Sequence, residues 1–147
     1  MVIAIDFDGT CVTHAYPDIG LDIGAVPILK ELVECHHDLI LYTMRSGHRL
    51  QAAVQWFEER GIPLYGVNTN PTQSSWSQSP KVYAELYIDD AALGCPLRVS
   101  NKSTRPYVNW TSVARRLHQM KLISDKHTDW FYVGKLPSAT EEEGGML

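Results

Sequence analysis

The chain has 147 residues, a hydrophobic fraction of 44% and a formal net charge of −4, which are ordinary values for one globular domain. This mild acidity argues against a large nucleic-acid-binding surface but leaves room for a local basic patch. No apolar run reaches the roughly 20 residues that span a bilayer, and the first residues lack the basic segment of a signal peptide. Cys11, Cys35 and Cys95 form no disulfide or zinc-binding pattern, so we expect reduced thiols in a cytoplasmic protein.

Short apolar runs alternate with helical patterns along the chain. The patterns predict strands at residues 2–6, 39–42, 64–67, 86–88 and 97–99, and helices at residues 25–35, 47–60 and 108–120, with a short helix starting at Lys81. Residues 11–23 and 68–80 are expected to form loops, because turn-forming and polar residues are concentrated there. This alternation predicts an α/β, three-layer, Rossmann-like fold with a mostly parallel central sheet.

We expect residues 1–134 to form one domain and residues 135–147 to be a flexible tail, since few apolar residues follow Pro137. The aromatic residues Trp110, Trp130, Phe131 and Tyr132 are expected in the core or in an interface. The sequence leaves open whether the segment from Trp130 to Val133 covers a sheet edge or joins a subunit contact.

Polar residues follow three of the expected strands. Asp6 and Asp8 end the first, Thr43 follows the second, and Asp89 and Asp90 follow the fourth. Ligands of such sheets bind outside the carboxyl ends of the strands, so we expect these residues around one crevice. Carboxylates brought together repel one another unless a cation binds them, and an all-oxygen ligand set favours Mg²⁺.

Phosphoryl transfer is the reaction that uses such a set. A carboxylate such as Asp6 can attack phosphorus, and a second acid such as Asp8 can protonate the leaving group and then activate water. Thr43 and Lys81 are candidates for binding the charged phosphoryl oxygens. Further candidates for contacting substrate are Gly9, which permits a sharp turn, Thr10 and Arg45.

The ordered motifs resemble those of the haloacid dehalogenase superfamily of phosphatases. They are Asp6-Phe7-Asp8-Gly9-Thr10, Leu39 to Thr43, Lys81, and Tyr87-Ile88-Asp89-Asp90. The resemblance implies a phosphatase that forms an aspartyl phosphate on Asp6 and uses Asp8 as general acid/base. It also implies Mg²⁺ bound by the Asp6 carboxylate, the Asp8 backbone carbonyl and the pair Asp89 and Asp90.

Members of this superfamily often carry a cap domain over the site. The segments between Thr10 and Thr43 and between Thr43 and Lys81 are too short for one, so the chain resembles the small capless type, including short bacterial hydrolases of unassigned function. An open site suits a phosphorylated macromolecule, whereas a second subunit could close it over a small phosphorylated molecule. We expect no membrane partner, and the acidity disfavours long nucleic acid.

Several site residues also have simpler explanations. Asp89 and Asp90 could form a turn or cap a helix, and Thr43 could cap the helix starting near Gly47. Lys81 and Arg45 could be surface charges. His14 and His48 could touch substrate, and Cys11 is expected to pack in the interior.

Two other functions use the same residue types. A receiver-like switch also combines acids, a hydroxyl and a lysine, although receivers place the acidic pair first in the chain and the lysine last. A binding module for phosphorylated ends, without turnover, is the other alternative. The intact motif residues and the presence of Asp8 favour a hydrolase over both.

Overall fold

Four parallel strands form the central sheet of this computed structural model, which describes residues 1–133. The sheet has the order β3-β2-β1-β4 and is built from β1 (Val2–Ile5), β2 (Asp38–Leu41), β3 (Gly66–Val67) and β4 (Leu86–Ile88). Strand β1 lies inside the sheet, and its residues Ile3, Ala4 and Ile5 are almost completely buried. A strand covered on both faces needs this continuous apolar run.

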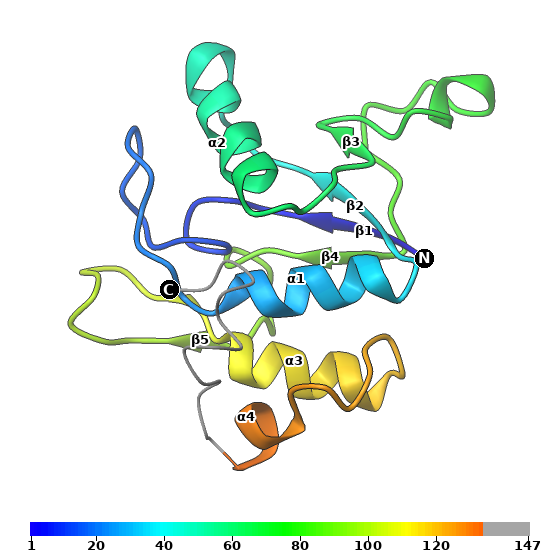
Figure 1. Cartoon of the computed structure of the whole chain (residues 1–147). Helices are drawn as coiled ribbons and strands as arrows, with labels where there is room; N and C mark the ends of the chain where they lie inside the picture. Colours follow the sequence, from blue (N-terminus) through cyan, green and yellow to red (C-terminus); the bar gives the residue numbers. More distant parts are fainter. Residues whose placement is uncertain (134–147) are drawn as a thin grey trace.

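Helices supply the crossovers that parallel strands require. Helix α1 (Ala25–Glu34) links β1 to β2, and α2 (Gly47–Glu59) links β2 to β3 (Figure 1). In α1 the buried residues Val26, Leu29 and Leu32 recur at helical spacing, as the sequence predicted. The expected α/β class, with a parallel sheet flanked by helices and no cap domain, is therefore confirmed for residues 1–133.

The two faces of the sheet are covered differently. Ile3 and Leu39 belong to the main hydrophobic core, together with buried residues of all four α-helices. The opposite face carries Ala4 and Ile40, with Tyr87 in register beside Ala4. The Tyr87 hydroxyl donates to the Val82 carbonyl (2.5 Å), so the segment before β4 covers this face.

The prediction of a short helix from Lys81 is wrong, because residues 81–85 form bends and irregular backbone without helical structure. Gln73, in the 3₁₀ helix Gln73–Ser75, supplies the missing hydrogen bonds through its side chain. It donates to the Lys81 carbonyl (2.7 Å) and accepts from the Tyr83 N–H (2.8 Å). A buried amide thus satisfies backbone groups that a helix would pair internally.

The fifth expected strand does not join the sheet. Strand β5 (Leu97–Arg98) instead pairs antiparallel with β6 (Tyr107–Val108), which the sequence did not predict as a strand. The Val108 N–H donates to the Gly9 carbonyl (2.9 Å), which attaches this hairpin to the loop after β1. Helix α3 follows at Trp110–Gln119, and the Trp110 indole donates to the Thr10 carbonyl (2.7 Å).

The described chain ends in α4 (Thr128–Val133), a helix that the sequence analysis did not predict. Trp130 and Phe131 are buried in the main core, whereas Tyr132 and Val133 are exposed. The expected tail at residues 135–147 lies outside the described residues. Among residues 1–133, no helix has both the length and the apolar character needed to cross a bilayer.

Candidate active site

Three carboxylates meet at the carboxyl ends of β1 and β4. Asp6 directly follows β1, and Asp89 and Asp90 directly follow β4, its parallel neighbour in the sheet. Oxygen atoms of the three side chains all lie within 4.8 Å of one another. The structure therefore brings together the acids that the sequence placed around one crevice. Asp89 also forms a local turn, since its Oδ1 accepts from the Ala91 N–H (2.8 Å).

The loop after β1 positions these carboxylates through Thr10. The Thr10 hydroxyl donates to Asp6 Oδ2 (2.7 Å) and accepts from the Asp90 N–H (3.0 Å), so one side chain links the two strand ends. Thr10 is fully buried. Its side chain organises the acids, and this position does not favour the expected contact with substrate.

Gly9 is required by close packing as well as by backbone conformation. Its φ angle is +79°, and a Cβ atom built on it would lie 2.0 Å from His14 Nε2 and 2.7 Å from Asp90 Oδ2. His14 Nε2 itself lies 2.8 Å from Asp90 Oδ2. His14 is thus a neighbour of the acidic cluster. The sequence predicted only that His14 could touch substrate. Its position in the loop between β1 and α1 gave no periodic signal.

Burial dominates the electrostatics of the cluster. It raises the pKa of the Asp6 carboxyl from 3.8 to about 8, against the lowering effect of the Thr10 hydrogen bond. Burial also raises the pKa of Asp89. The residues present fit a Mg²⁺ ion, because the donor atoms of Asp6, Asp89 and Asp90 are all oxygens and, within residues 1–133, no lysine or arginine pairs with these carboxylates.

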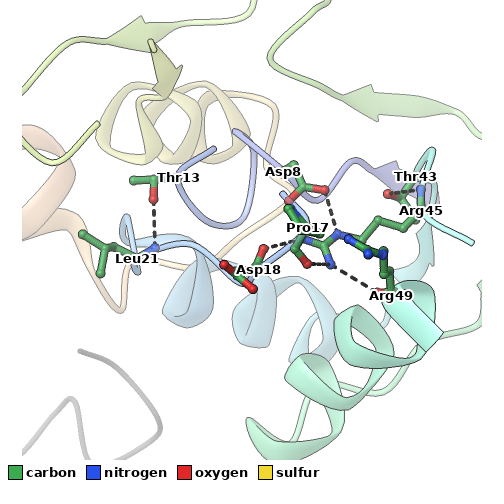
Figure 2. A network of polar contacts seen from close by, with 8 residues as sticks. All are labelled: Asp8, Thr13, Pro17, Asp18, Leu21, Thr43, Arg45 and Arg49. Atoms are coloured by element: carbon green, nitrogen blue, oxygen red, sulfur yellow. Dashed lines mark hydrogen bonds and ion pairs between the residues drawn. The ribbon is translucent and has the colours of Figure 1, made fainter. Parts of the chain in front are cut away.

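Asp8 is held in a separate ion pair with Arg45 (Figure 2). Arg45 Nη2 lies 2.7 Å from Asp8 Oδ1, and its Nε lies 2.8 Å from Asp8 Oδ2, the bidentate geometry that suits a guanidinium. Only 3% of Arg45 is exposed, so the alternative of a surface charge is wrong. A substrate contact by Arg45 stays a prediction, and its burial does not favour it.

Arg45 also holds the loop of residues 13–21 (Figure 2). Its guanidinium donates to the carbonyls of Pro17 (3.3 Å) and Asp18 (2.7 Å), and it lies 5.2 Å from the centroid of the Tyr16 ring. At the base of the loop, the Leu21 N–H donates to Thr13 Oγ1 (2.9 Å). One buried arginine therefore fixes both the candidate acid/base and the loop beside it.

Thr43 and Lys81 make their contacts with residues outside the acidic cluster. Thr43 follows β2, donates its N–H to Asn68 Oδ1 (2.8 Å) and accepts from the Arg45 N–H (3.2 Å). It is not the cap of α2, because Ser46 holds that position. Lys81 is exposed, with its Nζ 5.6 Å from the Tyr87 ring. Within residues 1–133, no hydrogen bond or ion pair joins Lys81 to the acidic cluster.

Comparison with known proteins gives one informative match. The solved structure of a conserved protein from Bacteroides thetaiotaomicron is similar to this chain, with a TM-score of 0.65 and 34% sequence identity. The match covers 82% of this chain and 91% of the other. The chain belongs to the same family as this conserved protein. No model of a known protein family matches the chain, and neither does any curated protein. This similarity identifies no activity, so the function of the chain is inferred from the geometry of its site.

The first prediction concerns the stability of the metal-free protein. Between about pH 4 and pH 8, folded Asp6 holds a proton that the unfolded chain releases. The free energy of unfolding should therefore fall as pH rises through this window, by up to about 1.4 kcal/mol per pH unit from this group. Urea denaturation in a chelator should show that Asp6→Asn flattens this dependence.

Mg²⁺ should stabilise the wild-type protein more at pH 8 than at pH 6, because it binds the deprotonated carboxylate. A pH dependence that is identical in the wild type and in Asp6→Asn would contradict the assigned pKa.

The second prediction concerns the Asp8–Arg45 pair. A double-mutant cycle with Asp8→Ala and Arg45→Met should give a coupling energy of about 0.5–3 kcal/mol, because two charge-assisted hydrogen bonds are lost together. The exposed pair Glu34–Lys126, with atoms 3.6 Å apart, is the matched control and should couple by about 0–1 kcal/mol. Equal coupling in the two pairs would refute a specific role for Arg45.

Proposed function

We propose that this protein is a Mg²⁺-dependent phosphomonoesterase of the haloacid dehalogenase type. The convergence of Asp6 with Asp89 and Asp90 carries the proposal. It gives one partly buried carboxylate the place of a nucleophile beside two acids that can hold a hard cation. Bound there, Mg²⁺ would neutralise negative charge on the phosphoryl group as it is transferred.

Asp6 would attack the phosphorus of a phosphomonoester, forming an O–P bond while the ester P–O bond breaks. Asp8, two residues further along the loop, would give a proton to the leaving alkoxide. In the second half-reaction, Asp8 would take a proton from a water molecule that attacks the same phosphorus and releases inorganic phosphate. The Arg45 hydrogen bonds occupy one lone pair on each Asp8 oxygen and leave others for this exchange.

Thr43 and Lys81 would contact the transferred phosphoryl group. Thr43 already lies at the carboxyl end of β2, next to β1. Lys81 would have to swing from the Tyr87 ring, which its flexible side chain permits. The order of the motifs along the chain, with Thr43 before Lys81 and Lys81 before Asp89 and Asp90, supports these two roles.

A receiver-like phosphoacceptor is the competing function with the same residues. It would need an aspartyl phosphate that survives, whereas Asp8 lies two residues from Asp6 as a built-in acid/base. We therefore favour hydrolysis. A phosphorylated form that persists for hours after substrate is removed would reverse this preference.

The test is hydrolysis of an aryl phosphate by the full chain in Mg²⁺. Asp6→Asn should abolish turnover, and Asp8→Asn should lower kcat by about 10²–10⁴-fold. The loss in Asp8→Asn should be larger for an alkyl phosphate than for a nitrophenyl phosphate, since a poor leaving group depends more on protonation.

The control is Asp125→Asn, a change at a carboxylate that is 89% exposed and pairs with His118. It should leave turnover unchanged. Full activity in Asp6→Asn would eliminate the proposed nucleophile. Tight binding of a phosphorylated ligand without any turnover would instead favour the non-catalytic binding module.

A further inference from the structure

The net charge of −4 conceals an uneven distribution along the chain. Residues 91–124 contain no acidic residue, so all seventeen Asp and Glu residues lie elsewhere. The same segment contains six cationic residues: Arg98, Lys102, Arg105, Arg115, Arg116 and Lys121. A cationic segment within an acidic protein indicates a surface that attracts anions.

Half of these cations lie on the hairpin formed by residues 97–108. Arg98, Lys102 and Arg105 are all exposed. The hairpin, yellow-green in Figure 1, extends from the carboxyl edge of the sheet on the same side as the blue loop before α1. Lys102 Nζ donates to the Asp22 carbonyl (3.3 Å), so the hairpin also contacts the end of that loop.

The hairpin is attached directly to the candidate site. The Val108 N–H bonds to the Gly9 carbonyl, and Val108 pairs with Leu97 on the next strand. Two strand spacings of about 4.8 Å therefore place the backbone beside Arg98 roughly 10 Å from Gly9. In a nucleotide, neighbouring phosphates are separated by one sugar, so a second phosphate beyond the scissile one can lie within reach of the Arg98 side chain.

The cations of the hairpin are available to a ligand. Within residues 1–133, no acidic side chain pairs with Arg98 or Arg105, whereas Arg45 and Arg60 contact Asp8 and Asp22. The ammonium of Lys102 retains two further donors. In the described part of the chain, residues 1–133, none of the three cations on this short hairpin forms an ion pair with an acidic side chain.

We propose that this hairpin binds a second phosphate group of the substrate, beyond the phosphomonoester that is hydrolysed. The inference rests on the proposed function for the identity of the first phosphate. The substrate would then be a molecule with at least two phosphate groups. The second group is either a phosphodiester of a polynucleotide end or another phosphate of a small bisphosphate.

The test measures binding to the Asp6→Asn protein in Mg²⁺, where turnover is removed. The ligands are a short single-stranded oligonucleotide with a 5′-phosphate, a nucleoside 3′,5′-bisphosphate and a nucleoside 5′-monophosphate. The hairpin variant combines Arg98→Gln and Arg105→Gln with the Asp6→Asn change of the parent protein. The control instead adds Lys121→Gln and Lys126→Gln, which remove the same charge near the other end of α3, about 15 Å away.

The hairpin variant should bind the oligonucleotide, the bisphosphate or both at least about tenfold more weakly, and the monophosphate within about twofold. For the oligonucleotide, the slope of the logarithm of the binding constant against the logarithm of the salt concentration should become shallower by about 0.7 for each lost phosphate contact. The ligand that responds identifies the source of the second phosphate. The control should bind all three ligands as the parent does.

Two results would overturn the inference. One is equal weakening by the hairpin variant and the control, which would show only a general charge effect. The other is equal weakening for all three ligands, which would show no second-phosphate site. If wild-type protein hydrolyses no phosphomonoester while the hairpin variant still loses affinity selectively, the proposed function fails and the binding surface stands.

Discussion

Three carboxyl groups meet at the ends of two neighbouring strands, where burial and their closeness oppose the ionisation of all three at once. Asp6 follows the central strand and loses hydration because the core surrounds it, which is why its pKa rises to about 8. Thr10 ties it to the backbone of Asp90, and His14 lies against the other side of Asp90. These contacts hold the acids in place, and the proposed Mg²⁺ would balance the charge of the carboxylates when all of them are ionised.

Arg45 binds Asp8 and holds its carboxylate apart from that cluster. The guanidinium engages both oxygens of Asp8 and two carbonyls of the neighbouring loop. Two carboxylates only two residues apart therefore have different surroundings. Asp6 lies among acids, whereas Asp8 faces a cation. Different surroundings allow different protonation states: burial favours the proton on Asp6, and the proposed nucleophilic role of Asp6 therefore requires a cation that displaces this proton.

The sequence predicted the parts of the fold that local pattern controls. The apolar run before Asp6 and the helical spacing in α1 and α2 were sufficient, and parallel pairing then brought Asp6 to Asp89 and Asp90. Contacts between segments distant in sequence were not predictable in this way. The non-helical backbone after Lys81 depends on the buried Gln73 amide, and the β5–β6 hairpin depends on its bond to Gly9. His14 and Arg45 were missed as partners because no spacing rule links them to Asp90 or Asp8.

The acidic cluster beside a cationic hairpin supports one proposal above the others, which is covalent catalysis by Asp6. The most direct measurement is peptide mass spectrometry after rapid acid quenching of wild-type protein turning over an aryl phosphate in Mg²⁺. The account predicts a phosphoryl group on Asp6, formed before free phosphate accumulates and absent from Asp6→Asn. Turnover with the phosphoryl group on another residue would contradict it.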